Sequence, residues 1–461
     1  NEEISGTEQF GSDPVIIATG AVPRPPKNVP GYERMIEACD YLNGAEVGET
    51  VAVIGGGASG MLAAIAAARR QASVLLLEQN DRPGKKLLST GNGKCNYTNE
   101  KQGISFYWGD DPAFVMPVFS QFDKTALVSL FAELGIYPFV RDGYYYPYSG
   151  QASAVQEILE AEVRRLGVSI ACGQRAVSIQ KRGRRFLIAT ETDHFQACTC
   201  IVAAGGLAAP KTGSDGFGLR AAKAFGHRIV PTHPSLVPLT AKGKFLSQWA
   251  GVRARGRVSL YVDGHLECED EGELQLTKDG ISGIPVFQVS RFAAAALDRR
   301  KRVEAKLDFF PEKDMAEFSH MLAARMFHTA KNRTVGDALL GLLNRKLHGC
   351  VCQAAGLHPT RELSALTDKD AGRLARAIKT FPVSVTGTRG YDFAQTTAGG
   401  VSTAELIPET MESRLCGGLY FAGETVDIDG ICGGYNLQWA WSSGYVAGYH
   451  AAEAADRQEN R

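Results

Sequence analysis

Residues 51–78 read VAVIGGGASGMLAAIAAARRQASVLLLE, and this stretch decides the fold of the chain. The apolar run 51–54 is typical of a buried strand, the alanine-rich run 59–71 of a helix, and the run 73–78 of a second strand. A strand, a helix and a strand in this order indicate a parallel sheet. The run is too rich in glycine near its start to favour a membrane-spanning helix, so we expect no membrane partner.

The turn between the first strand and the helix has the spacing of a dinucleotide-binding motif. Gly55, Gly57 and Gly60 follow the pattern G-x-G-x-x-G, which allows a tight turn, close approach of a pyrophosphate and close packing of helix on strand. Glu78 ends the second strand about 20 residues later, where an acidic side chain accepts hydrogen bonds from a ribose diol. We therefore expect FAD or NAD here; the alternative is a tight turn that binds no ligand.

The composition excludes several classes of protein. The 461 residues include 50 basic residues (Lys plus Arg) and 50 acidic residues (Asp plus Glu), so the net charge is zero. A protein that covers nucleic-acid phosphates needs an excess of basic residues, so we expect no nucleic-acid partner. The 10 cysteines form no C-x-x-C pair, and the 9 histidines form no H-E-x-x-H motif. We therefore predict no metal site and a reducing, cytoplasmic location.

A second set of glycine-rich turns decides between the two dinucleotides. The strand 201–204 ends at Gly205-Gly206, and the strand 418–422 ends at Gly423-Glu424. Glu424 can accept hydrogen bonds from ribityl hydroxyls, and the N–H groups of residues 435–437, at the start of the final helix, can stabilise negative charge on a reduced flavin. A dehydrogenase that uses NAD alone has no need of this second contact, so the sequence indicates FAD.

Several motifs together carry a resemblance to a known family. Residues 85–99, 212–218, 397–401 and 418–448 resemble the BaiN-like NAD(P)/FAD-dependent oxidoreductases, also called aminoacetone-oxidase-like flavoproteins, and the similarity extends over roughly residues 50–455. The resemblance implies an α/β fold, in which a discontinuous Rossmann-like FAD-binding domain carries an inserted antiparallel, barrel-like β domain and a helical domain. For members named after bile-acid metabolism it implies reduction of a ring C=C bond conjugated to a ketone.

The pattern along the chain shifts where such insertions would begin and end. The expected parts are an N-terminal extension or fusion remnant at 1–48, with a possible fusion partner upstream of Asn1; the FAD-binding domain at 49–236 and 394–461; the β-rich insert at 237–310 and 380–393; and the helical insert at 311–379.

The motifs also nominate residues for the site. The expected cofactor-binding residues are Gly55, Gly57, Ala58, Ser59, Gly60, Glu78, Lys86, Gly91, Asn92, Gly93, Cys95, Asn96, Ala204, Gly205, Gly206, Gly216, Gly423, Glu424, Asp429, Gly434, Tyr435, Asn436 and Leu437. Tyr435 and Tyr391 are the candidate catalytic proton donors. The tyrosine-rich run 141–148 is either a plain hairpin or the lining for a flat apolar substrate.

The predicted function is reduction of a conjugated C=C bond in an apolar, bile-acid-like or steroid-like ring. FAD carries the hydride, and NAD(P)H is the transient donor. One alternative is a flavin oxidase that acts on a small amine and uses oxygen. A second is a non-catalytic nucleotide-binding protein, and a flavin-dependent RNA modifier is disfavoured by the balanced charge.

Overall fold

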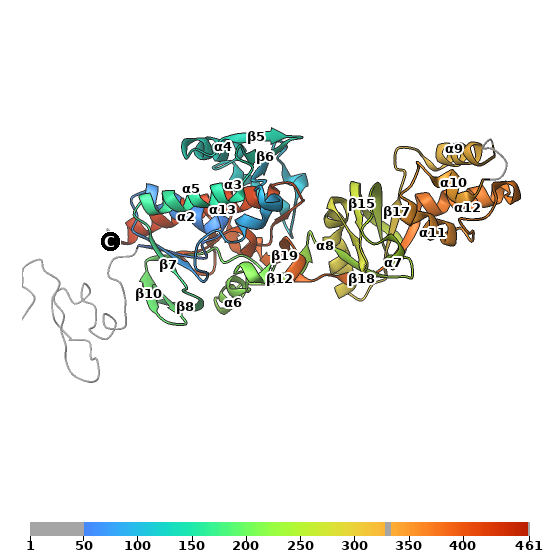
Figure 1. The fold of residues 1–461 in the computed structure, drawn as a ribbon. Helices are drawn as coiled ribbons and strands as arrows, with labels where there is room; N and C mark the ends of the chain where they lie inside the picture. The colour runs from blue at the N-terminus through green and yellow to red at the C-terminus, as the bar shows by residue number, and fades with distance from the viewer. Residues whose placement is uncertain (1–49, 328–332, 460–461) are drawn as a thin grey trace, which may run out of the picture.

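The computed structural model describes residues 50–327 and 333–459, the last two of these, 458 and 459, by their backbone alone. The segment expected as an N-terminal extension, 1–48, lies outside the described residues. Figure 1 shows three parts in a row: an α/β part, a barrel and a helical part farthest from the chain's C-terminus. In the part of the chain that is described, no helix is both long and apolar enough to cross a bilayer.

A seven-stranded sheet forms the centre of the α/β part. Five of its strands are parallel, in the order β22-β11-β1-β2-β7, and β21 and β20 continue the sheet in antiparallel fashion beside β22. Their bounds are β1 Val51–Ile54, β2 Val74–Glu78, β7 Ser169–Cys172, β11 Thr199–Val202, β20 Leu406–Ile407, β21 Glu412–Ser413 and β22 Leu419–Phe421. The predicted strand–helix–strand start is confirmed, and β1 and β2 are fully buried, as parallel strands covered on both faces are.

Helices cover one face of this sheet, and a small sheet with α6 lies on the other side (Figure 1). The helices of this part are α2 Ala58–Arg69, α3 Val115–Phe119, α4 Lys124–Glu133, α5 Ala152–Arg165, α6 Phe217–Ala224 and α13 Tyr435–Glu459. The smaller sheets are β8 Ala176–Arg182 with β9 Arg185–Thr190 and β10 His194–Ala197; β12 Ile229–Ser235 with β19 Thr396–Val401; β4 Tyr107–Trp108 with β23 Asp429–Gly430; and β3 Thr98–Asn99 with β6 Tyr144–Pro147 and β5 Pro138–Arg141.

Helices α2 and α13 pack together with almost no space between their backbones. A Cβ atom at Gly444 would lie 2.2 Å from the carbonyl oxygen of Ser59, and one at Gly448 would lie 2.1 Å from that of Ala63. Because these glycines have no side chain, the two helices approach closely, with the first turn of α2 against the middle of α13.

The insert is a closed antiparallel barrel, which confirms the predicted barrel-like β domain within the Rossmann-type fold. Its strands follow the order β13-β16-β15-β14-β17-β18. The bounds are β13 Leu239–Lys242, β14 Arg253–Val262, β15 His265–Leu276, β16 Gly280–Ser282, β17 Val303–Asp308 and β18 Phe381–Thr388, with helices α7 Leu246–Trp249 and α8 Ile284–Asp298. The helical part contains α9 Met315–Phe327, α10 Val335–Leu339, α11 Arg345–Ala354 and α12 Asp368–Lys379.

Helix α8 connects the barrel to the α/β part through buried polar contacts. Arg291 donates two hydrogen bonds of 3.1 Å to the carboxylate of Asp429, which is only 1% exposed. Gln288, one turn earlier, accepts a 2.8 Å hydrogen bond from the backbone N–H of Cys432. The same helix therefore fixes the position of the glycine-rich segment that precedes α13.

Candidate active site: the cavity between two helix N-termini

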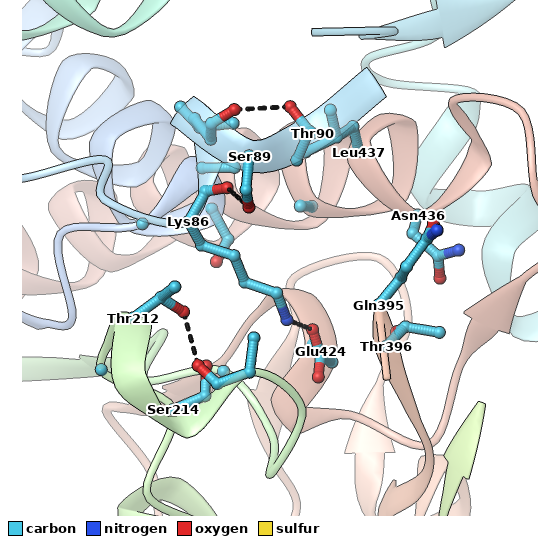
Figure 2. A pocket seen from close by; sticks show the side chains of 18 of the residues that line it. Lys86, Ser89, Thr90, Thr212, Ser214, Gln395, Thr396, Glu424, Asn436 and Leu437 are labelled. Atoms are coloured by element: carbon cyan, nitrogen blue, oxygen red, sulfur yellow. Dashed lines mark hydrogen bonds and ion pairs between the residues drawn. The ribbon is translucent and has the colours of Figure 1, made fainter. Parts of the chain in front are cut away.

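A cavity of about 610 Å³ opens where the carboxyl ends of the parallel strands face the first turns of α2 and α13. Its walls come from loops that are far apart in the sequence, including the turn after β1, the segment 84–96 and the segment 203–217. Segments 394–396 and 424–440 add further walls (Figure 2), and residues of β2, β6 and α8 also contribute to the lining. Open α/β sheets bind their ligands at this edge.

The glycines of the first turn serve different purposes: Gly55 and Gly60 lie where a Cβ atom would clash with the backbone, and Gly57 faces open space. Gly55 has a φ of +101°, and a Cβ there would lie 2.5 Å from the carbonyl oxygen of Ala203. A Cβ at Gly60 would lie 1.8 Å from the carbonyl oxygen of Gly55, so this glycine lets the helix meet the strand. A Cβ at Gly57 would meet nothing within 4 Å, because this residue faces the cavity.

The first turn of α2 is arranged to hold an anion. Gly57 is its N-cap residue and supplies no side-chain cap, so no side chain blocks the free N–H groups of that turn. Ala58 and Ser59 line the cavity at this point. A pyrophosphate placed here would accept hydrogen bonds from free N–H groups at the positive end of the helix.

Glu78 lines the cavity at the end of β2, and its carboxylate is already fixed by the backbone. One oxygen accepts a 2.8 Å hydrogen bond from the N–H of Gly56, and the other accepts 2.8 Å and 2.6 Å hydrogen bonds from Asn80. The side chain is held in one orientation, in which its remaining lone pair can accept a hydrogen bond from a ribose hydroxyl. Sequence reasoning missed Gln174 and Arg175, which line the same end after β7 and belong to no motif.

An ion pair joins the walls in the middle of the cavity. The Lys86 ammonium lies 2.6 Å from one carboxylate oxygen of Glu424 (Figure 2). The other oxygen accepts hydrogen bonds from the N–H and the hydroxyl of Thr397 at 3.1 Å and 2.8 Å. Glu424 is therefore rigid, and Lys86 places a positive charge between the two helix N-termini.

The start of α13 forms the far end of the cavity. Gly434, Asn436 and Leu437 all line it. The side-chain amide of Asn436 both donates to and accepts from the backbone of Gly430 at 2.8 Å, which fixes the turn before the helix. Free N–H groups of this first turn lie where they would stabilise negative charge on a reduced ring.

The residues present fit FAD. Gly57 leaves open space in front of one helix N-terminus, and a second helix N-terminus lies across the cavity. Asn96 lines the cavity, and its Oδ1 is buried without a hydrogen-bond partner among the described residues. A buried oxygen of this kind is costly unless something satisfies it, and a ring N–H of a bound cofactor would do so.

Not every predicted cofactor contact lines the cavity. Gly60, Gly93, Cys95, Gly206, Gly216, Gly423, Asp429 and Tyr435 are absent from its walls. Gly206 and Gly423 act behind the walls: a Cβ at the first would lie 2.4 Å from Thr397 Oγ1, and one at the second 2.6 Å from Ser59 Oγ. Burial raises the pKa of the Cys95 thiol to about 12, which disfavours a reactive thiolate. As direct cofactor contacts these residues remain predictions.

The two predicted proton donors also lie outside the cavity lining. Tyr435 is buried, and its ring stacks on Phe106 with ring centroids 4.8 Å apart. Tyr391 lies in a short 3₁₀ turn, where its carbonyl oxygen accepts a 2.9 Å hydrogen bond from the N–H of Ala209. Their catalytic role remains a prediction.

The tyrosine-rich run is a hairpin, and two of its tyrosines line the cavity. Tyr144 and Tyr146 on β6 are part of the wall, whereas Tyr145 points to the opposite face and donates to Glu100. Burial raises the pKa of both Tyr144 and Tyr146, so their hydroxyls stay protonated at neutral pH. The apolar side chains Ile284 and Phe287 of α8 also line the cavity.

The fold and the site together define an FAD-dependent oxidoreductase of the Rossmann class. A sheet with a G-x-G-x-x-G turn, an acidic residue at the end of β2 and a second helix N-terminus make a binding site for a long dinucleotide. No group of three or more His, Cys, Asp or Glu side chains in residues 50–327 and 333–459 could hold a metal ion.

Comparison with known proteins gives the family. Residues 49–450 match the HI0933-like protein Rossmann domain. The chain is 42% identical to a 3-dehydro-bile acid delta(4,6)-reductase of Clostridium scindens over 87% of this chain and 99% of that protein. It is 30% identical to a ribosomal RNA dihydrouridine synthase of Haemophilus influenzae over 86% of this chain and 96% of that protein. Among solved structures, the open conformation of a flavocytochrome c3 fumarate reductase has a TM-score of 0.49 and 16% identity, over 90% of this chain and 80% of that one.

The chain belongs to the HI0933-like family, and the BaiN-like resemblance of its motifs is confirmed.

Proposed function

We propose that this protein reduces a C=C bond conjugated to a ketone in a largely apolar ring substrate, of the bile-acid or steroid type, with NAD(P)H as the electron donor. The relative from Clostridium scindens, a 3-dehydro-bile acid delta(4,6)-reductase, supports the reaction and the substrate class at 42% identity. The observation that carries the proposal is the composition of the cavity wall beside α13, where Tyr144, Tyr146 and Phe287 form an aromatic boundary.

The chain's own residues account for binding and for charge. When bound, FAD supplies the hydride. The first turn of α2 would hold the pyrophosphate in the middle of the cofactor, the first turn of α13 would hold negative charge on the reduced ring, and the fixed carboxylate of Glu78 would orient the ribose. The aromatic wall excludes water from the reacting ring.

Protonation of the substrate's α-carbon needs a group that is still protonated at neutral pH. A tyrosine hydroxyl meets this requirement at its ordinary pKa, and Tyr144 and Tyr146 are the tyrosines among the described residues that line the cavity. They are better placed than Tyr435, whose side chain is packed behind the wall.

The described residues offer the electron donor no separate nucleotide-binding domain. The described residues contain one parallel sheet with one G-x-G-x-x-G turn, and FAD would occupy that turn. NAD(P)H would therefore bind transiently at the open side of the same cavity and leave before the substrate enters.

A second candidate is the same bond chemistry on RNA. The 30% identical relative is a ribosomal RNA dihydrouridine synthase, and dihydrouridine is uridine whose ring C=C bond has been reduced. The zero net charge and the higher identity to the bile-acid enzyme favour the small substrate.

The test combines flavin reduction with product analysis. Under anaerobic conditions NADH or NADPH should bleach the flavin absorbance, and a 3-oxo-Δ4 steroid should restore it with formation of the saturated ketone. Failure of both nicotinamides to bleach the flavin would overturn the donor. Peroxide release with a small amine in air, without steroid reduction, would favour the oxidase instead.

A further inference from the structure

One face of the β5–β6 hairpin continues from the cavity to the outside of the protein as a row of aromatic rings. Directly paired residues of two antiparallel strands project to the same side. Phe139 pairs with Tyr146 and Arg141 with Tyr144, and the N–H of Tyr148 donates a 2.8 Å hydrogen bond to the carbonyl of Tyr137. We call Tyr137, Phe139, Tyr144, Tyr146 and Tyr148 the aromatic face. In Figure 1 the hairpin lies at the edge of the α/β part, beside α4.

The inner end of the aromatic face belongs to the cavity. Tyr144 and Tyr146 are cavity walls, and they lie against glycines of the two loops proposed to hold the cofactor. A Cβ at Gly433 would be 3.0 Å from Tyr144 Cε1, and one at Gly91 would be 3.6 Å from Tyr146 Cε1. A ring bound beside the flavin would therefore touch these two tyrosines.

The outer end of the aromatic face is exposed to an unusual degree. Tyr137 is 64% exposed, Phe139 48% and Tyr148 76%, and the rings of Phe139 and Tyr148 meet edge to face at 6.2 Å. The other face of the hairpin is anchored by Tyr145, which donates a hydrogen bond to Glu100 and contacts Tyr97 and Lys124. Contiguous exposed aromatic residues mark binding surfaces.

The charges around the aromatic face favour an uncharged partner. Arg141 projects on this side, but it forms an ion pair of 3.5 Å with Asp142. Burial raises the pKa of Tyr144, and the nearby negative charge of Asp270 in the barrel adds to that shift. A phosphate backbone would meet acidic groups here and no unpaired arginine on this side of the hairpin.

We propose that the aromatic face is the specificity surface for a fused-ring, apolar substrate: the reacting ring enters between Tyr144 and Tyr146, and the remaining rings lie on Phe139 and Tyr148. This proposal rests on the proposed function for the identity of the reacting ring. It predicts that affinity grows with the number of rings, whereas a single-ring enone reaches only the inner tyrosines.

The experiment compares a 3-oxo-Δ4 steroid with cyclohex-2-enone. In the Phe139→Ser/Tyr148→Ser double variant we expect about a tenfold higher KM for the steroid, an unchanged kcat, and unchanged kinetics with cyclohex-2-enone. Tyr148→Phe keeps the ring and should behave as the wild type. Leu266→Ser, at an equally exposed apolar position on the barrel, is the matched control and should change nothing.

Equilibrium dialysis of labelled steroid separates this proposal from the proposed function. Suppose that the wild type binds the steroid, that the double variant binds it about tenfold more weakly, and that neither protein reduces it. The role of the aromatic face in binding is then supported, and the proposed reaction is wrong. Absence of steroid binding by the wild type would overturn the aromatic face, as would equal losses with both enones. Weaker binding of a ribosomal RNA fragment by the double variant, with steroid binding intact, would also overturn it.

Discussion

The two ends of the cavity are built in different ways. The nucleotide end centres on one continuous stretch from β1 to β2, with Gln174 and Arg175 beside it after β7. Backbone geometry decides the glycines of that stretch, since Gly55 and Gly60 meet carbonyl oxygens that leave no room for a Cβ atom. The ring end is assembled from β6, α8 and the start of α13, which are far apart in the sequence. The nucleotide end therefore suits a dinucleotide of either kind, whereas the ring end distinguishes FAD from NAD through the start of α13 and leaves β6 and α8 free to vary with the substrate.

The largest expected effect comes from adding one methyl group at the nucleotide end. Gly60→Ala would place a Cβ 1.8 Å from the carbonyl oxygen of Gly55 and force α2 away from β1. We expect the free energy of unfolding to fall by about 3 kcal/mol and the protein to purify without flavin. Urea unfolding and the absorption spectrum measure both.

Gly57→Ala is the matched control, since its Cβ would meet no protein atom within 4 Å. Stability should stay within about 0.5 kcal/mol of the wild type, while affinity for FAD falls. Unchanged affinity would show that no pyrophosphate lies at this turn.

The next effect is a pH dependence of the free energy of unfolding, and it comes from Asp427, in the segment between Glu424 and the start of α13. Burial raises the pKa of Asp427, which is 1% exposed, to about 7. The folded state then binds a proton between about pH 4 and pH 7 that the unfolded state has released, so this group's contribution to stability falls as pH rises to 7 and is constant above it.

Asp427→Asn should remove this dependence, because an amide can still accept the 2.9 Å hydrogen bond from the N–H of Asp110 and does not titrate. Between pH 5 and pH 7 the wild type should lose about 2 kcal/mol more stability than the variant. Parallel pH profiles for the two proteins would contradict the assignment.

A smaller effect is expected from the ion pair in the middle of the cavity. Glu424→Gln leaves the Lys86 ammonium without its 2.6 Å partner but keeps an acceptor for Thr397. A neutral amide accepts hydrogen bonds from ribityl hydroxyls less strongly than a carboxylate does. We therefore expect the Kd for FAD to rise about tenfold, as measured by flavin fluorescence. Glu160→Gln removes an ion pair with Arg164 at the surface and should leave the Kd for FAD unchanged. If both substitutions changed the Kd equally, the Lys86–Glu424 ion pair would have no specific role in binding FAD.

The contrast between the two ends also explains what the sequence could predict. The glycines at 55, 57 and 60 and the acid at 78 are visible because their spacing follows from backbone geometry. The wall residues Gln174 and Phe287 carry no such spacing, since Gln174 reaches the cavity only through the pairing of β7 with β2 and Phe287 only through the docking of α8 from the insert. The position of Tyr435 at the helix N-terminus predicts a proton donor, but its side chain packs behind the wall, where stacking on Phe106 holds it.

The most direct test of the central claim is a single turnover without nicotinamide. The protein is reduced by light under anaerobic conditions, with EDTA as the electron donor, and is then mixed in the dark with a 3-oxo-Δ4 steroid. If the cavity places reduced flavin beside a conjugated C=C bond, flavin absorbance returns and one equivalent of the saturated ketone forms. A flavin that stays reduced in the presence of bound steroid, and is oxidised only when oxygen is admitted, would contradict the account.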